Sequence, residues 1–234
     1  MWPATIVFVR HAESIGNTMT ADARTQSGIG ANLYTLTPLG EQQARITSTW
    51  LRAHVPNPDG FYTSYYTRTR ATAALLYPDR EPYVDERLAE AQRGIWHVMT
   101  RKEIATHLPW EIRRKELEGL FHHRPLGGEN WPDIRLRVRS FNHMVHRRYA
   151  GKTLVVVVHG FWLLMWKSIT HHWTIDETEA LYTKFDRDRL VENASVTIYR
   201  GVEREGRNVI IPDPDQPYVI PWKDEIPSTA CELA

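Results

Sequence analysis

Short runs of apolar residues alternate along the chain with longer stretches in which apolar residues recur at helical spacing. Residues 5–9 and 154–158 are apolar on both faces and rich in β-branched side chains, as is typical of central strands in a parallel sheet. A further strand is predicted at residues 61–64. The pattern predicts an α/β fold in which a mostly parallel sheet is covered by helices on both faces.

The predicted helices begin and end at recognisable signals. Thr37 followed by Pro38 is typical of an N-cap and a first helical residue, and Pro56 should end that helix. Three further helices are predicted at residues 71–77, 133–149 and 161–172. We expect the last of them to fill the core with the side chains of Trp162, Trp166 and Trp173.

Two stretches differ from this pattern. Residues 95–130 lack strand character, so we expect an insertion of helices and loops that lies over the functional site. Residues 212–234 are rich in proline and are predicted to form an extended C-terminal tail. A chain of 234 residues is compatible with one larger domain, and we expect a single domain over residues 1–234.

Side chains suited to catalysis follow two of the predicted strands directly. Arg10 and His11 come after the first strand, and His159 comes after residues 154–158. Ligands bind outside the carboxyl ends of the strands in open α/β sheets. We therefore expect these three side chains to lie at one site.

Composition excludes several classes of protein. Hydrophobic residues make up 42% and charged residues 24% of the chain, as in globular domains. The run at residues 154–158 is far shorter than the roughly 18 apolar residues of a membrane span, so no membrane association is expected. The sequence shows no secretory signal pattern, and Cys231 is its only cysteine; both features favour a cytoplasmic location without an internal disulfide.

The net charge of +1 hides a basic middle region. Residues 93–152 carry 13 lysines and arginines against 6 acidic residues, whereas residues 201–234 carry 3 against 7. The basic region favours a small anionic ligand over nucleic acid, which would call for a strongly basic domain and a known binding motif. His143 and His146 lack acidic or cysteine partners at ligand spacing, so we expect no metal and no cofactor.

Several short motifs follow one another in a fixed order. They are Arg10-His11-Ala12-Glu13-Ser14 with Asn17, Thr63-Ser64 with Arg68 and Thr72-Ala73, Leu88 with Glu90 and Gly94, Gly127-Gly128-Glu129, residues 155–160, and Asn193-Ala194-Ser195-Val196. In this order they resemble the histidine phosphatase superfamily, which contains cofactor-dependent phosphoglycerate mutases and many phosphatases. The resemblance covers about residues 5–200 and implies a three-layer α/β/α sandwich like that of phosphoglycerate mutase.

The sequence departs from the family pattern at three places. Ala12 stands where many members have glycine, and Asn130 stands where serine is usual after Gly-Gly-Glu. Residues 65–67, Tyr-Tyr-Thr, precede Arg68 in place of a polar-Leu-x pattern, so we expect different packing around this arginine.

The resemblance assigns a role to each motif residue. His11 is implied to be the nucleophile that forms a phosphohistidine, and Glu90 the acid that protonates the leaving oxygen and then activates water. Arg10, Asn17, Arg68 and His159 are implied to bind the phosphate. The chemistry of these residues agrees, because an unprotonated imidazole nitrogen can attack phosphorus and guanidinium groups bind phosphoryl oxygens in pairs.

The predicted function is a metal-independent phosphomonoester hydrolase that acts on small phosphorylated metabolites. A cofactor-dependent phosphoglycerate mutase and a non-catalytic phospholigand-binding protein are the alternatives. Candidate substrate-binding residues in the insertion are Trp96, Phe121, His123 and Arg124, of which Arg124 is the leading candidate for contact with a remote anionic group. The sequence leaves the oligomeric state open, with a homodimer among the options.

Overall fold

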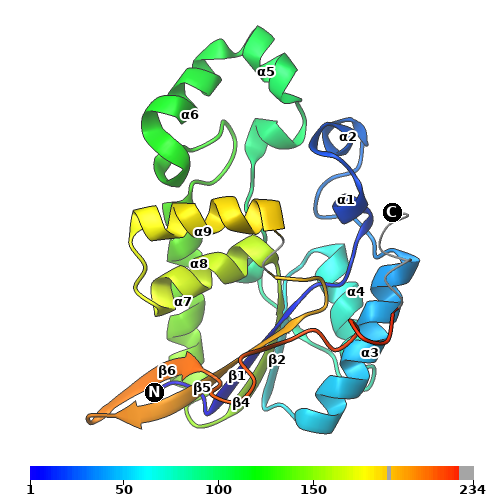
Figure 1. Ribbon diagram of the computed structural model, residues 1–234, viewed down its shortest axis with the longest axis vertical. Coiled ribbons are helices and arrows are strands. Elements are labelled where there is room, and N and C mark those ends of the chain that lie inside the picture. Colours follow the sequence, from blue (N-terminus) through cyan, green and yellow to red (C-terminus); the bar gives the residue numbers. More distant parts are fainter. Residues whose placement is uncertain (189–190, 227–234) are drawn as a thin grey trace.

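A single sheet forms the centre of the computed structural model, which describes residues 1–188 and 191–226 (Figure 1). Within these residues the strand order is β3-β2-β4-β1-β5-β6, and β7 pairs with β5. The strands are β1 (Thr5–Arg10), β2 (Gly60–Thr63), β3 (Tyr83–Val84), β4 (Thr153–Val158), β5 (Val196–Arg204), β6 (Arg207–Pro212) and β7 (Tyr218–Val219). The predicted strands thus form the middle of the sheet.

The sheet has a parallel and an antiparallel part. β1 and β2 each run parallel to β4, and β3 runs parallel to β2. β5 runs antiparallel to β1 and forms a hairpin with β6, closed by Glu205 and Gly206 at φ of 51° and 70°. A two-residue turn with positive φ at both positions matches the twist of the two strands. The family motif at residues 193–196 indicated only the start of this hairpin.

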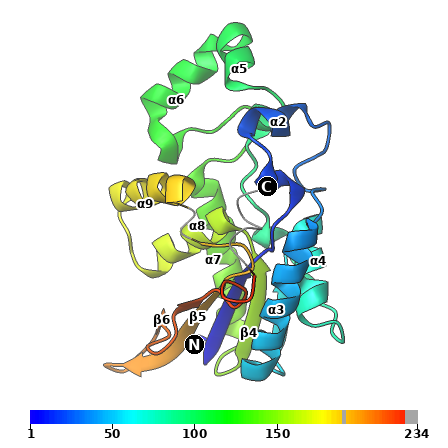
Figure 2. The ribbon, with the colours of Figure 1, turned by 45° about the vertical axis from the view of Figure 1, so that its right-hand side comes forward.

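Helices cover both faces of the sheet, as predicted (Figures 1 and 2). On one face α3 (Pro38–His54) and α4 (Thr67–Leu76) pack against Val155 and Val157 of β4. On the other face α7 (Trp131–Arg148) and α8 (Gly160–Thr170) pack against Val156 and Val158. Because neighbouring residues of a strand point to opposite faces, the unbroken apolar run of β4 serves both layers.

Two helix boundaries differ from the prediction. α4 begins at Thr67, earlier than the predicted residue 71, so Arg68 lies in its first turn. α8 ends at Thr170, and Trp173 therefore lies outside the helix, where it is only partly buried. Trp162 and Trp166 are fully buried as expected, and each indole N–H has an acceptor, the Arg87 carbonyl and Asn142 Oδ1 respectively.

The insertion consists of a 3₁₀ helix, η2 (Gly94–His97), followed by α5 (Arg101–His107) and α6 (Pro109–His122). In both ribbon views α5 and α6 project beyond the sandwich, next to α2 (Ala21–Gln26) and above α9 (Ile175–Asp188). α6 is kinked at Gly119, whose φ of 73° suits a residue without a Cβ. Beyond the kink, Glu179 of α9 accepts the backbone N–H of Phe121 and joins the insertion to the sandwich.

The C-terminal segment joins the sheet at β7 and continues in turns to Ile226, where the described residues end. β7 adds to β5, and the Trp222 indole N–H donates to the Asn193 carbonyl at 2.7 Å. Cys231 and the rest of the predicted tail lie outside the described residues. Among the described helices, none has the length and apolar composition needed to cross a bilayer.

Candidate active site

His11 lies directly after β1 and is 3% exposed. Its Nδ1 lies 2.8 Å from the Ala12 carbonyl oxygen. A carbonyl oxygen can only accept a hydrogen bond, so Nδ1 carries the proton and Nε2 carries the lone pair. This tautomer leaves Nε2 able to act as a nucleophile.

Arg68 lies between the two strand-end histidines. Its Nε donates to Nε2 of His11 at 3.0 Å, and its Nη2 lies 3.1 Å from Nδ1 of His159. The remaining nitrogen, Nη1, donates to the Ala31 carbonyl at 2.7 Å. A buried guanidinium thus links the carboxyl ends of β1 and β4 through two hydrogen bonds and is held by a third at Ala31.

His159 follows β4 and is fully buried. Because arginine can only donate, Nδ1 of His159 accepts from Arg68 and the proton lies on Nε2. Among the residues that the structure describes, no acceptor lies within hydrogen-bonding reach of this Nε2. A buried N–H without a partner is costly, and an oxygen of a bound ligand would satisfy it.

Both histidines are neutral in this arrangement. Burial, followed by the positive charges of Arg68 and Arg10, holds the pKa of His11 well below the ordinary histidine value. Burial and the charge of Arg68 likewise hold the pKa of His159 well below that value. Low pKa values keep the lone pair of His11 available at neutral pH.

The backbone around His11 is fixed by the loop at residues 191–195. The Asn193 side-chain amide donates to the His11 carbonyl at 2.9 Å, and the Ala194 N–H donates to the Arg10 carbonyl at 3.1 Å. The guanidinium of Arg10 donates to the Val191 carbonyl. From the other side, Thr72 Oγ1 accepts the Ala12 N–H at 3.0 Å. Residues of the first, second and last sequence motifs therefore meet at the nucleophile loop.

A cavity of about 460 Å³ opens at this edge of the sheet. It is lined by Arg10, His11, Asn17, Arg68 and Glu90, so the structure brings together five of the residues singled out in the sequence. Asn17 also caps α1 (Ile15–Thr18), where its Oδ1 accepts from the backbone N–H and hydroxyl of Ser14. Its amide nitrogen is the group that remains to donate to a ligand.

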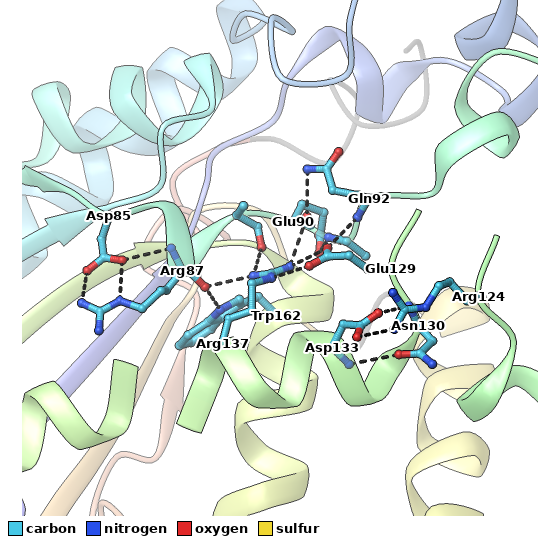
Figure 3. Close-up of polar contacts among 12 residues, drawn as sticks. Asp85, Arg87, Glu90, Gln92, Arg124, Glu129, Asn130, Asp133, Arg137 and Trp162 are labelled. Atoms are coloured by element: carbon cyan, nitrogen blue, oxygen red, sulfur yellow. Dashed lines mark hydrogen bonds and ion pairs between the residues drawn. The ribbon is translucent and has the colours of Figure 1, made fainter. Parts of the chain in front are cut away.

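Hydrogen bonds from Arg137 hold the backbone next to Glu90 (Figure 3). Nη1 of Arg137 donates to the carbonyls of Arg87 and Ala89, each at 2.9 Å. The same guanidinium forms a two-nitrogen ion pair with Glu129, at 2.7 and 2.9 Å, and Glu129 accepts the Gln92 N–H at 3.1 Å. The third and fourth sequence motifs are thereby joined around the candidate acid.

Gly94 and Gly128 bring the same two motifs close together. Gly94 has a φ of 51°, and a Cβ on it would lie 2.0 Å from the Leu126 carbonyl oxygen. A Cβ on Gly128 would lie 2.6 Å from the Gln92 carbonyl oxygen. Both positions therefore require glycine for steric reasons.

Two of the predicted substrate-binding residues line neither this cavity nor the one that adjoins it. Phe121 belongs to the hydrophobic core, where it packs against Trp131. The side chain of Arg124 is 55% exposed and pairs with Asp133 at 2.6 Å, in the first turn of α7 (Figure 3). The environment of Phe121 is apolar, and Arg124 already has a carboxylate partner.

The other two insertion residues lie at the site or next to it. Trp96 lines the cavity, and its indole N–H donates to the fully buried Glu111 at 3.1 Å. His123 lies 3.2 Å from Glu111 and lines a second, adjoining cavity.

Sequence reasoning missed several residues that line the cavity. Tyr66 packs edge-on against His159 at 4.7 Å between ring centroids, and its ring lies 4.6 Å from the Arg68 guanidinium. Its hydroxyl accepts from Gln92 at 2.7 Å. The Tyr-Tyr-Thr departure from the family pattern was the available signal. Arg24 and Arg93 also line the cavity, and no motif indicated them.

Within residues 1–188 and 191–226, no three histidine, cysteine or carboxylate side chains gather as a metal would require.

Comparison with known proteins agrees with this geometry. The sequence pattern of the histidine phosphatase superfamily (branch 1) matches residues 6–211. A curated relative, phosphoserine phosphatase 1 of Hydrogenobacter thermophilus, is 30% identical over 157 residues, which cover 66% of this chain and 70% of the relative.

Solved structures share the fold. A putative α-ribazole-5′-P phosphatase of Escherichia coli aligns with a TM-score of 0.68 at 18% identity, over 89% of this chain and 95% of the other. A phosphoserine phosphatase of Entamoeba histolytica, solved with 3-phosphoglyceric acid, aligns with a TM-score of 0.62 at 24% identity, over 88% and 94% of the two chains.

The predicted fold is confirmed, as is the prediction of a phosphomonoester hydrolase. The match of the family pattern to nearly the whole described chain, together with the motif residues gathered around His11, leads to one conclusion. The chain belongs to branch 1 of the histidine phosphatase superfamily.

Proposed function

We propose that the protein hydrolyses small phosphorylated metabolites through a phosphohistidine at His11, without a metal ion. The observation that carries the proposal is the hydrogen bond from Nδ1 of His11 to the Ala12 carbonyl, which leaves the Nε2 lone pair at the cavity beside Arg68. A non-catalytic phosphate-binding protein has no need of such a fixed tautomer.

The first step transfers the phosphoryl group. Nε2 of His11 forms a bond to phosphorus while the bond from phosphorus to the leaving oxygen breaks, and Glu90 gives its proton to that oxygen. In the second step Glu90, now a carboxylate, takes a proton from water. The water oxygen attacks phosphorus, the P–N bond breaks, and inorganic phosphate leaves with His11 and Glu90 restored.

Positive charge in the cavity stabilises the phosphoryl oxygens. Arg10 and Arg68 line the cavity and supply guanidinium groups. His159 is not among the lining residues, but Gly160, the next residue, is, and the unsatisfied Nε2–H of His159 would be a further donor to a bound phosphoryl oxygen. Donors that are already in place act strongly on charge that develops in the transition state, because the site does not have to reorganise. Asn17 adds its side-chain amide at the same cavity.

The substrate class follows from charge. Within the described residues, the cavity is lined by the four arginines Arg10, Arg24, Arg68 and Arg93 and by one carboxylate, Glu90. This excess of positive charge favours a phosphomonoester dianion. The relatives named as phosphoserine phosphatases act on a substrate of this kind, which supports the assignment.

Turnover of p-nitrophenyl phosphate by the purified protein in the presence of EDTA tests the proposal. We expect activity that EDTA does not reduce, because arginine and histidine donors take the place of a metal. Loss of activity that Mg²⁺ or Zn²⁺ restores would contradict the mechanism. Interconversion of 2- and 3-phosphoglycerate faster than their hydrolysis would favour a mutase instead.

A further inference from the structure

A second cavity, of about 270 Å³, adjoins the first one beneath the insertion. Both cavities are lined by Gln92, Arg93, Trp96, Phe161 and other residues in common, so they lie side by side with a shared wall. A ligand with its phosphoryl group at His11 would reach the second cavity by extending past Trp96, which lines both.

The wall of the second cavity on the sandwich side is apolar. Trp131 and Ile134 of α7 and Phe161 of α8 contribute to it, and Leu120 of α6 adds to it from the insertion. Removing a ligand's apolar surface from water at such a wall favours binding, by roughly 25 cal/mol for each Å². The chamber thus suits a carbon skeleton rather than a second sugar-like, strongly hydrated group.

Three cations of the insertion line the same cavity, namely Arg93, Arg101 and Lys115. Within residues 1–188 and 191–226 none of them forms an ion pair with a carboxylate. Nζ of Lys115 lies 4.5 Å from the centre of the Trp96 ring. Burial lowers the pKa of Lys115, and the charges of Arg101 and Arg93 add to this effect while the charge of Glu111 opposes it.

The two acidic residues that line this cavity do not balance the three cations. Glu129 already forms its ion pair with Arg137, at 2.7 Å. Asp22, in the first turn of α2, is exposed like Arg93 and Arg101, and it offsets only one of the three charges. The cavity therefore keeps an excess of positive charge on its insertion side, opposite an apolar wall.

We infer that this second chamber binds the leaving-group end of the substrate, and that this end is an apolar carbon chain or ring that terminates in an anionic group. The inference rests on the proposed function, since the phosphoryl group is placed at His11. The terminal anion lies near Lys115 and Arg93, while Trp96 separates the two chambers. The contact with a remote anion that the sequence suggested for Arg124 is thus reassigned to Lys115.

Two series of substrates of equal chain length test the inference. One series consists of straight-chain alkyl phosphates, and the other of alkyl phosphates that end in a carboxylate. In the wild-type protein we expect kcat/KM to be higher for the carboxylates at the chain lengths that reach Lys115, with a maximum at one length. Chains of the same length that end in an ammonium group should be poorer substrates than either.

The advantage of the carboxylate series is its kcat/KM divided by that of the plain alkyl phosphate of equal length. Lys115→Met should lower this ratio by about tenfold or more, which corresponds to the loss of one charged hydrogen bond. It should leave the plain alkyl phosphates and p-nitrophenyl phosphate unchanged. Arg113→Met is the matched control, because Arg113 lies on the same helix but is exposed and lines neither cavity. Equal rates for the two series at every length, or equal losses on both in Lys115→Met, would overturn the inference.

Binding of the corresponding phosphonates, which cannot be hydrolysed, separates this inference from the proposed function. Calorimetry should show tighter binding of the carboxyalkyl phosphonates than of the alkyl phosphonates, and Lys115→Met should abolish the difference. This result would support the chamber even if p-nitrophenyl phosphate were not turned over. Hydrolysis of p-nitrophenyl phosphate with no difference between the phosphonates would leave the proposed function standing and refute the chamber.

Discussion

Nε of Arg68 donates to Nε2 of His11 across 3.0 Å, so the guanidinium occupies the lone pair that the proposed chemistry uses. The same guanidinium holds Nδ1 of His159 through Nη2. In the proposed mechanism an incoming phosphoryl group would displace the first contact and offer its oxygens to Arg68 in exchange, and charge-assisted bonds of this kind are stronger than neutral ones. Phosphate binding and exposure of the nucleophile would then be a single event.

Replacement of Arg68 should therefore affect both phosphate binding and the transition state. We expect Arg68→Gln to lower kcat/KM for p-nitrophenyl phosphate by about a hundredfold or more, the usual cost of losing one transition-state donor. Arg68→Lys should not restore activity, because an ammonium cannot contact both histidines and the Ala31 carbonyl. Arg70→Gln is the control, since Arg70 is an exposed residue of the same helix. Similar losses in both variants would show that α4 needs arginine for stability instead.

His159 is predicted to act as a neutral donor. His159→Phe keeps an aromatic ring next to Tyr66 but removes the N–H, and we expect it to reduce kcat by about a hundredfold with a folded protein by circular dichroism. His159→Gln, which retains a side-chain N–H, should be less impaired. Equal activity of the Phe variant and the wild type would exclude His159 from phosphate binding.

Glu90 is predicted to matter most when the leaving group is poor. An alkoxide requires a full proton from the acid, whereas a phenolate requires little, so Glu90→Gln should slow alkyl phosphates far more than aryl phosphates. Steady-state rates on a matched alkyl and aryl pair provide the measurement. Glu86→Gln changes an exposed carboxylate nearby and should leave both rates unchanged. Equal slowing of both substrates by Glu90→Gln would show that another group acts as the general acid.

The buried histidines predict how stability depends on pH. Burial and nearby arginines hold the pKa of His11 and His159 well below the ordinary value, and burial lowers that of His97 to about 4. Below about pH 6.5 the unfolded chain binds protons that the folded chain does not. The free energy of unfolding should therefore be highest above pH 6.5 and fall as the pH decreases, by roughly 1.4 kcal/mol per pH unit for each such histidine.

Urea unfolding at pH 7.5, 6.0 and 5.0 in phosphate-free buffer measures this dependence. The buffer matters because bound phosphate would favour protonated histidine. His159→Gln should reduce the slope of the free energy of unfolding against pH by the contribution of one histidine. Constant or increasing stability between pH 6.5 and 5 would show that the buried histidines are protonated in the folded protein.

The parallel part of the fold could be predicted because its signals are local. The β-branched run lies within β4 itself, and the Thr37-Pro38 signal lies at the start of α3 itself. The β5–β6 hairpin could not be found in this way, because Glu205-Gly206 is a weak turn signal and β6 becomes a strand only by pairing with β5. The end of α8 at Thr170, before Trp173, depends on a turn in which His172 adopts a φ of 56°.

The centre of the site could be predicted for a similar reason. Arg10, His11 and His159 follow buried strands, so their place at one sheet edge follows from topology alone. The outer site could not be predicted, because the positions of insertion side chains depend on contacts between distant residues. Arg124 and Lys115 are both cations of one basic region, so the sequence does not distinguish them. The structure does, because it shows Arg124 paired with Asp133.

Covalent labelling of His11 tests the central claim most directly. The protein is mixed with a substrate that carries a labelled phosphoryl group and is quenched in base within milliseconds, and the modified peptide is sequenced. The mechanism predicts label on His11 that is stable to base, is lost in acid and is absent from His11→Ala, which should retain its fold but not its turnover. Label on any other residue, or His11→Ala activity within tenfold of the wild type, would contradict it.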